Sequence, residues 1–522
     1  MKKKILLTLG ALSAIGLARG ASNDVSGQTF LTVRPEWQSP SPAKSSHFWP
    51  GQNEFLREGG WGSAFQGAVF GGRSTGSTDL GKYFMFGGKT SLFVAGDDAV
   101  VGAPFSPDQG VGRDVNPFYF NIRSATVGDQ TFSSTITFRP QQTVVGGGFE
   151  FRSYISWFGC DCNGEPQWWF DLSFPVMNVR NDMRLSETVI TPQTTPAAGT
   201  ATSMTQAFMG GNGFSATTTT TWLYGKINGS RNKTGVADVE VKLGFDYNLS
   251  DCSFVSGYFG FVAPTGNRPK AQYVFEPIVG NNHHWGILTG GYMGYELMEF
   301  CQGGLFLEVE TNARYLFSNH QVRSFDLYNR PWSRYMAVYT AAPVAPFPPT
   351  ALTPGINVFT QPVTVHPHFQ HSITTALMWQ RCGFEAELGY NFWARQAEGV
   401  RLRNAFGTAG SFPTGVAIAD VTTPAPDLTG DINRASTIGA NFGGTAIPYS
   451  TTNGTTITQA DLNLQSAATP AALTHTVYGS LGYNWDCWCW PVFVSAGGSY
   501  EFSTNNVALN RWLAWGKLGI SL

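Results

Sequence analysis

The sequence repeatedly alternates apolar and polar residues over stretches of about ten residues, and this pattern restricts the fold more than any other feature. Around residues 237–245, apolar side chains at every second position alternate with Glu240 and Lys242. Residues 305–315 and 384–395 repeat the pattern with other side chains. Strands of about this length and period cross a membrane with one face toward lipid and the other toward a polar interior. The repetition therefore predicts a transmembrane β-barrel.

The alternating segments predict eleven strands between residue 143 and the C-terminal residue. They cover residues 143–158, 168–182, 236–249, 253–265, 284–298, 304–318, 368–381, 383–397, 474–486, 491–504 and 510–522. Four less regular segments precede them, at residues 62–74, 84–95, 117–123 and 131–139. Since closure of a membrane barrel requires an even number of strands, we predict roughly 12 to 16 strands and favour about 14.

Short and long connections alternate between the predicted strands. The short connections contain all seven cysteines and lie at residues 159–167, 250–252, 299–303, 382 and 487–490. The long connections contain no cysteine and lie at residues 183–235, 266–283, 319–367 and 398–473. Outer-membrane barrels have short periplasmic turns and longer external loops. The predicted fold is therefore all-β: a transmembrane, antiparallel, up-and-down β-barrel with short periplasmic turns and long external loops.

The N-terminal residues predict export. Three lysines precede an apolar stretch at residues 5–17, and small residues follow it, as in a secretory signal peptide cleaved after Gly20. The predicted organisation is a signal peptide at 1–20, a periplasmic lead-in or plug at 21–60, and the barrel at 61–522. No later apolar stretch is long enough for a membrane helix. We therefore expect an outer-membrane protein in contact with the lipid bilayer and lipopolysaccharide, with a secreted sandwich or propeller as the soluble alternative.

The signal peptide, the Gly- and aromatic-rich strands and the final residues 512–522 together resemble a Gram-negative outer-membrane porin over residues 60–522. The chain ends in Leu522, where an aromatic residue is usual in that family. The resemblance implies passive diffusion of solutes and, because many porins are trimers, a homotrimer. The cysteine-bearing turns are similar, more narrowly, to the major outer-membrane porins of the chlamydial type, which are cross-linked through disulfides.

The cysteines are candidates for disulfide bonds because export leads to a compartment that permits them. They are Cys160, Cys162, Cys252, Cys301, Cys382, Cys487 and Cys489. The two pairs separated by a single residue are poorly suited to a relaxed internal bridge. Bonds between turns, or to a neighbouring chain or envelope protein, are one hypothesis. Cysteines without any partner outside the chain are the other.

One loop, residues 323–334, is denser in charge and aromatic residues than any other. If it folds into the lumen, Arg323, Arg330 and Arg334 are candidate selectivity residues with Asp326 opposite them. A surface loop ordered by its own Arg–Asp contacts is the alternative. The candidate pore-lining residues on the strands are Glu308, Glu310, Arg314 and Arg395.

Basic residues outnumber acidic ones near the predicted external ends and loops. A basic mouth would concentrate anionic solutes, which favours anion transport. It would equally pair with lipopolysaccharide phosphates. The sequence contains no nucleophile–base motif, no phosphate-binding loop and no histidine cluster with metal-ligand spacing, so we predict no enzyme activity, cofactor or metal, and no nucleic-acid partner.

The function predicted from the sequence is an outer-membrane porin that lets small hydrophilic solutes diffuse passively, with a tilt toward anions. The alternative is a structural surface barrel whose lumen is plugged and which is linked to the envelope through disulfides. Its role would be envelope integrity or adhesion.

Overall fold

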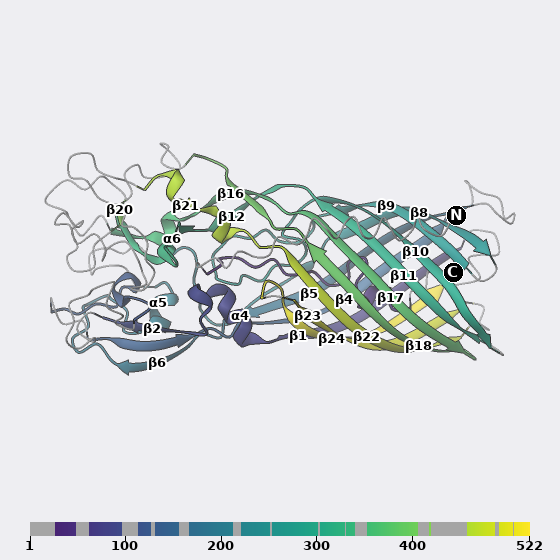
Figure 1. Ribbon diagram of the computed structural model, residues 1–522, viewed down its shortest axis with the longest axis horizontal. Coiled ribbons are helices and arrows are strands. Elements are labelled where there is room, and N and C mark those ends of the chain that lie inside the picture. Colours follow the sequence, from purple (N-terminus) through teal and green to yellow (C-terminus); the bar gives the residue numbers. More distant parts are fainter. Residues whose placement is uncertain are drawn as a thin grey trace.

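Twelve antiparallel strands close into one barrel in the computed structural model (Figure 1). The structure describes residues 27–47, 62–96, 113–126, 131–155, 166–211, 221–250, 253–300, 303–328, 330–339, 352–405, 417–418, 457–485, 490–504 and 506–522. Each barrel strand pairs with its neighbours in sequence order, and β1 pairs with both β24 and β4 to complete the ring. The architecture is therefore the predicted up-and-down barrel.

The barrel strands follow the alternating segments of the sequence closely. They are β1 (Ser63–Thr75), β4 (Gln141–Tyr154), β5 (Gln167–Asp182), β8 (Val239–Ser250), β9 (Ser253–Ala263), β10 (Gly286–Phe300), β11 (Gly303–Leu316), β17 (His368–Arg381), β18 (Phe384–Arg395), β22 (Ala472–Trp485), β23 (Val492–Ser503) and β24 (Asn510–Ser521). Twelve strands lie at the lower end of the predicted range, and the favoured count of fourteen was wrong. Three of the four early candidate segments fold outside the barrel, and only residues 62–74 form a barrel strand, β1.

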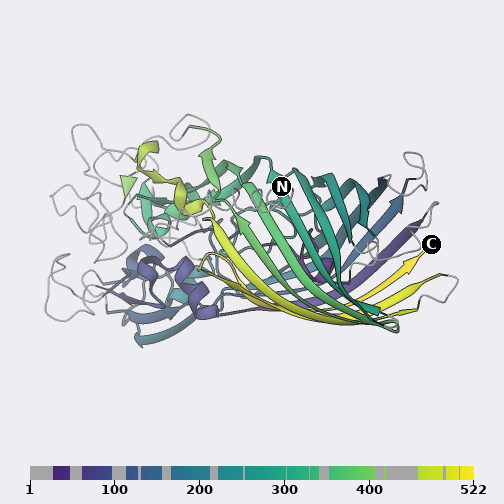
Figure 2. The ribbon, with the colours of Figure 1, turned by 45° about the vertical axis from the view of Figure 1, so that its right-hand side comes forward.

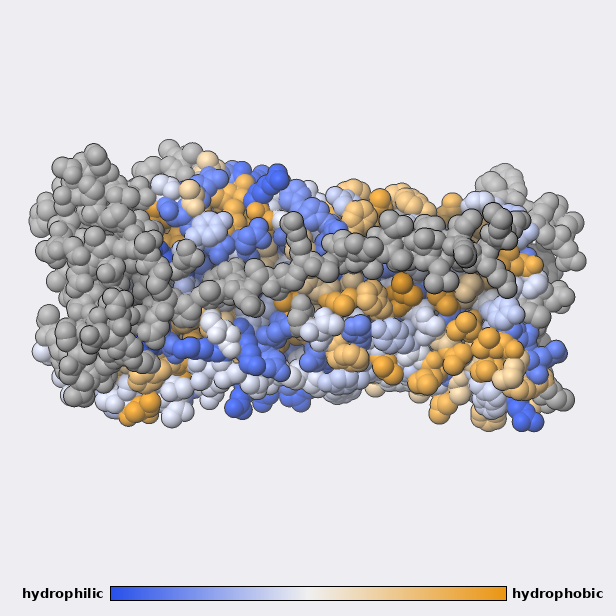
Figure 3. All heavy atoms as spheres, in the orientation of Figure 1, coloured by the Kyte–Doolittle hydropathy of each residue, from blue (hydrophilic) through white to orange (hydrophobic). Residues whose placement is uncertain are grey.

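The outer face of the barrel is apolar. Along β8, Leu243 and Phe245 are exposed while Glu240 and Lys242 are fully buried. Exposed apolar side chains cover the other strands as well, among them Val69, Val145, Phe259, Phe261, Leu388, Leu481 and Leu518. Figure 3 shows apolar residues gathered over the barrel strands. Such a surface is stable against lipid and unfavourable in water.

Exposed aromatic side chains mark both ends of this apolar surface. Phe300, Trp379, Phe384 and Trp490 lie toward one end, and Trp285, Phe317, Phe369, Phe502 and Trp512 lie toward the other. Amphipathic rings favour the two interfaces between lipid and water. Trp169, by contrast, points inward and is buried, and its Nε1–H donates to Asp246 at 2.8 Å.

The two ends of the barrel differ. At the end that we call the turn end, short connections join β8 to β9, β10 to β11, and β17 to β18. The start of β1 and the end of β24 lie at the same end, since Ala64 pairs with Ser521. All the long connections leave the opposite, loop end (Figures 1 and 2).

The long connections fold into a separate layer at the loop end, which we call the cap. Its strands are β2 (Ser91–Ala95), β3 (Ser133–Thr137), β6 (Ser186–Thr191), β12 (Asn319–Ser324), β13 (Asp326–Leu327), β14 (Ala337–Tyr339), β15 (Leu352–Pro354), β16 (Thr360–His366), β19 (Gly399–Leu402), β20 (Ala417–Ile418) and β21 (Leu462–Asn463), and β7 (Arg231–Val236) extends β5 toward it. Its helices are α4 (Ser77–Phe84), α5 (Met204–Phe208) and α6 (Gly355–Val358), with 3-10 turns η2 (Phe86–Gly88), η4 (Pro117–Phe120), η6 (Ser333–Tyr335), η8 (Gln459–Asp461) and η9 (Leu464–Ala467).

An aromatic core holds the cap together. Trp332 is completely buried, and its ring centroid lies 5.4 Å from Phe86 and 5.7 Å from Phe138. Its indole N–H donates to the Phe84 carbonyl at 3.0 Å.

None of the described helices is long and apolar enough to cross a membrane.

Candidate channel lumen

The inward face of the barrel is polar and densely charged. Its acidic side chains are Glu150, Asp171, Glu240, Asp246, Glu296, Glu308, Glu310, Glu385, Glu387 and Glu501, and its basic side chains are Arg152, Lys242, Arg314, Arg395, Arg511 and Lys517. Among the described strand residues, ten carboxylates therefore face six cationic groups. Every second strand position points inward, so the alternation that predicts the barrel also places these charges in the lumen.

The N-terminal segment, residues 27–47, runs through this lumen. At the loop end, the Gln28 backbone N–H donates to Tyr83 of α4 at 2.9 Å. Near the turn end, the His47 backbone N–H donates to Glu387 at 2.7 Å. Between these points lies the short helix α2 (Pro42–Ser45). The segment therefore lines up along the barrel axis and occupies the space where a solute would pass.

One aromatic residue of the segment packs tightly against the wall. The Trp37 ring stacks on Phe70 at 6.3 Å, and its Nε1–H donates to the Phe149 carbonyl at 3.3 Å. Gly148 makes this position possible, because a Cβ atom there would lie 2.0 Å from the indole. The glycine is thus required for close approach of the segment to β4.

Lys44 is the centre of an ionic cluster between the segment and the wall. Its Nζ donates to Ser173 at 2.6 Å and lies 3.2 Å from Glu240 and 3.5 Å from Glu150. Glu240 also accepts from Arg314, which donates to Gln38 of the segment at 2.9 Å. Two carboxylates from different strands, Glu150 on β4 and Glu240 on β8, therefore bind the single ammonium group of Lys44.

His47 and the neighbouring backbone form a second set of contacts. His47 Nδ1 lies 2.7 Å from a Glu385 oxygen. Three strands further round the barrel, on β24, Lys517 Nζ donates to the carbonyl oxygen of Lys44 at 2.9 Å and to that of Ser46. These contacts fix α2 from several strands at once.

A third set lies nearer the loop end. Arg34 donates to Asn391 at 2.9 Å, and its guanidinium lies 3.6 Å from Glu501. Glu36 pairs with Arg511 at 2.5 Å. The segment therefore contributes both signs of charge, and each is matched by an opposite charge on the wall.

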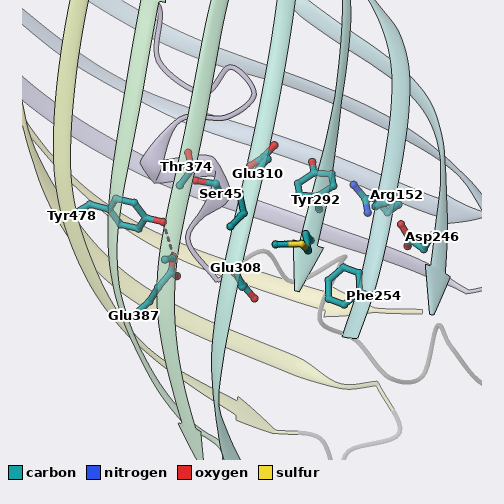
Figure 4. A pocket seen from close by; sticks show the side chains of 14 residues that line it. Ser45, Arg152, Asp246, Phe254, Tyr292, Glu308, Glu310, Thr374, Glu387 and Tyr478 are labelled. Carbon is teal, nitrogen blue, oxygen red and sulfur yellow. Dashed lines mark hydrogen bonds between the residues drawn. The ribbon is translucent and has the colours of Figure 1, made fainter. Parts of the chain in front are cut away.

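A cavity lies beside α2 in the part of the barrel toward the turn end (Figure 4). The cavity volume, counted as the space that the centre of a water molecule can reach, is about 50 Å³. Its labelled lining residues are Ser45, Arg152, Asp246, Phe254, Tyr292, Glu308, Glu310, Thr374, Glu387 and Tyr478. Tyr478 donates to Glu387 at 2.7 Å, and Arg152 stacks 3.8 Å above the ring of Trp169. The lumen is therefore occupied but not filled.

The four strand residues predicted to line the pore all face the lumen side. Glu308 and Glu310 line the cavity, whereas Arg314 binds the segment. Arg395 donates to the carbonyl oxygens of Thr32 and Val507 near the loop end. All four therefore lie against the cavity or the segment, and their part in selectivity stays a prediction.

The four loop residues predicted as a constriction are buried in the cap. Asp326 accepts from Arg334 Nη1 at 2.7 Å and from the backbone N–H of Trp332 at 3.2 Å. Arg323 donates twice to Gln321, at 2.9 and 2.7 Å, and burial lowers the pKa of Arg323 to about 10. Arg330 is buried as well. These contacts order the loop, and no selectivity role for the four residues follows from them.

Of the seven cysteines, only Cys382 lies within the described residues. It is exposed in the turn between β17 and β18, at the turn end. The other six, Cys160, Cys162, Cys252, Cys301, Cys487 and Cys489, lie outside the described residues. The disulfide hypotheses therefore stay predictions. Within the described ranges, no three His, Cys, Asp or Glu side chains are grouped to hold a metal ion.

Sequence reasoning missed the residues of the segment itself. Residues 21–60 were left open between a lead-in and a plug, and Arg34, Glu36, Trp37, Lys44 and His47 were not singled out. A usable signal was present, because charged and aromatic side chains within residues 34–47 interrupt a stretch otherwise rich in Ser and Pro.

The fold defines the class: the chain is an antiparallel up-and-down β-barrel with an apolar outer face and a polar interior, the architecture of outer-membrane barrels. No protein-family model and no curated protein matches the sequence. Among solved structures, it is similar to an outer-membrane channel of Pseudomonas putida, at 8% identity over 88% of this chain and 96% of that chain, with a TM-score of 0.35.

Two further structures are similar in the same way. The toluene transporter TodX of Pseudomonas putida shows 8% identity over 96% of this chain and 97% of its own, with a TM-score of 0.31. A FadL homologue of Pseudomonas aeruginosa shows 7% identity over 88% and 90%, with a TM-score of 0.26. Similarities this loose carry no argument about solutes, and none supports the chlamydial likeness.

Proposed function

We propose that the protein is an outer-membrane channel for small hydrophilic solutes and that residues 27–47 close its lumen in the conformation described. The turn end would face the periplasm and the cap the exterior, as in other barrels with short turns and long loops. Passage then requires the segment to shift aside, and no cofactor takes part.

The observation that carries this proposal is the polar nature of the contacts between the segment and the wall. Lys44, His47 and Arg34 bind through charged and hydrogen-bonding groups, which water can satisfy when the segment moves. Trp37 makes the tight apolar contact within the barrel, whereas Phe30 and Leu31 are buried at the loop end, Leu31 in the aromatic core of the cap. Apart from Trp37, the part of the interface inside the barrel can therefore rearrange without exposing much apolar surface.

The charge of the wall favours cations. The tilt toward anions predicted from the sequence depended on basic residues at the external mouth; of these, Arg323, Arg330 and Arg334 are buried in the cap, whereas others, such as Arg180, Arg268 and Lys270, are exposed at the loop end. The lumen wall has four more carboxylates than cationic groups among the described strand residues. With the segment displaced, the field of this wall would concentrate cations.

The test is single-channel conductance in planar bilayers, comparing the refolded chain with Lys44→Gln/His47→Gln. Each charge-assisted hydrogen bond contributes about 1.5–3 kcal/mol, so the double variant should raise the open probability at least about tenfold. The reversal potential under a salt gradient should have the sign expected of a cation-selective channel.

The matched control is Lys82→Gln, which removes an exposed ion pair with Asp79 in α4 and should leave conductance unchanged. A folded double variant that remains as silent as the wild type would contradict the channel proposal.

The second candidate function is a structural surface barrel. The aromatic core of the cap favours it, because the long connections form a folded layer over the loop end instead of separate loops. If the barrel stays closed in both Lys44→Gln/His47→Gln and Lys82→Gln, the structural surface barrel becomes the better-supported function.

A further inference from the structure

We propose that the cavity beside α2 is a binding site for small organic cations that carry an ammonium group on a short apolar chain. The inference rests on the proposed function, because it names the solute class of the same lumen. It starts from the side chains that line the cavity. Four of them, Asp246, Glu308, Glu310 and Glu387, are carboxylates, and a single one, Arg152, is cationic.

The lumen already binds an ammonium group a short distance away. Lys44 precedes Ser45, which lines the cavity, and its Nζ is held by Ser173, Glu240 and Glu150. The protein thus carries a working example of ammonium recognition by one hydroxyl and two carboxylates. A solute with the same group would meet the same chemistry in the adjoining space.

A second observation points to a ligand in the cavity itself. Ser256 of β9 lines the cavity and is only 8% exposed, yet its Oγ has no hydrogen-bond partner among the described residues. Glu310, which also lines the cavity, is 7% exposed. A buried hydroxyl and carboxylate of this kind are stabilised by an N–H donor that carries positive charge.

The remaining lining selects against a bare ion. Phe254, Met293, Val309 and Ala376 present apolar surface, and the rings of Tyr292 and Tyr478 flank the acidic side (Figure 4). Aromatic faces attract organic cations, and methylene groups gain by leaving water. No set of described ligands suits a coordinated metal ion. The cavity therefore fits an alkylammonium ion better than an anion or a metal.

The experiment uses n-butylammonium as the probe and isothermal titration calorimetry on the full, refolded chain in detergent. Wild type should bind it saturably. Neutral n-butanol, which has the same apolar tail, should bind at least about tenfold more weakly, a difference of about 1.4 kcal/mol. Equal binding of the two probes would overturn the inference, and this comparison needs no variant.

The variant test is Glu310→Gln, with Glu299→Gln as its matched control. Glu299 is exposed at the turn end of β10 and does not line the cavity. Glu310→Gln should weaken n-butylammonium binding about tenfold, whereas Glu299→Gln should leave it unchanged. Heat-modifiable migration on gels verifies that both barrels are folded. Unchanged binding in folded Glu310→Gln would place the cation elsewhere and refute the site.

The two proposals fail separately. If Lys44→Gln/His47→Gln conducts while wild type binds no n-butylammonium, the cation site is wrong and the channel stands. If wild type binds the probe with the stated dependence on Glu310 but neither form conducts, the site stands in a barrel that is not a channel.

Discussion

The lumen and the cap are built on opposite principles. In the lumen, residues 27–47 meet the wall through ion pairs and hydrogen bonds such as those of Lys44 and His47. In the cap, large rings pack on one another, with Trp332, Phe138 and Tyr335 fully or almost fully buried. Apolar burial is lost when a core opens, whereas water can replace much of a polar contact. If the protein is the channel that we propose, the cap would stay folded while the lumen rearranges.

The strongest test of this comparison is to remove the completely buried Trp332 ring from the cap. Trp332→Ala should destabilise the cap by about 3–5 kcal/mol, because it leaves a cavity among aromatic side chains and removes a hydrogen bond to Phe84. Guanidinium unfolding followed by near-ultraviolet circular dichroism measures the loss. The barrel should keep its heat-modifiable migration.

Tyr328→Ala is the control for this variant, since Tyr328 lies in the same stretch of the chain and is half exposed. A Trp332→Ala protein as stable as the control would show that the aromatic cluster does not hold the cap. A barrel that unfolds together with the cap would show that the two regions are one cooperative unit.

The barrel could be predicted from the sequence because its signal is local. Each strand alternates lipid-facing and lumen-facing residues, as Leu243 and Lys242 do in β8, so the period is visible in about ten residues. The same rule misjudged the strand count. Residues 131–139 contain a real strand, β3, but it pairs with β2 and β6 in the cap, and nothing local separates it from a barrel strand.

The lumen contacts could not be predicted because their partners are far apart in sequence. Arg34 and Asn391 are separated by 357 positions, and His47 and Glu385 by 338. Glu308 and Glu310 were predicted as lumen residues because they follow the strand period. Arg323 and Arg334 were predicted as a constriction from their density in a loop, and that density gives no information on which side of the loop packs inward.

A second variant disturbs the segment without touching the charges. Gly148→Ala places a methyl group where the Trp37 indole lies, and overpacking of this kind costs about 1–3 kcal/mol. We expect the segment to move from the wall, with a red shift of tryptophan emission and more frequent channel opening. Gly147→Ala is the matched control, because its Cβ would point outward and lie 3.4 Å from the nearest atom. Identical opening of both variants would mean that Trp37 does not hold the segment.

The smallest expected effect sharpens the comparison at the boundary between the two regions, where His284 precedes β10. Its Nδ1 lies 2.7 Å from the Phe317 carbonyl and its Nε2 lies 2.8 Å from the Gln321 amide nitrogen. Nδ1–H therefore donates and Nε2 accepts, which only the neutral ring can do. Burial lowers the pKa of His284 to about 4.

Because the folded pKa of His284 is depressed, the unfolded chain binds more protons between about pH 6.5 and pH 4, and stability falls as the pH falls through that window. Lowering the pH from about 7 to about 5 should cost about 2 kcal/mol through this residue. Guanidinium unfolding of the cap at the two pH values measures the change, and His284→Gln should reduce it while His320→Gln, on β12, should not. An equal pH dependence in wild type and His284→Gln would mean that the ring is charged in the folded protein, and the boundary would then belong with the ionic lumen instead of the apolar cap.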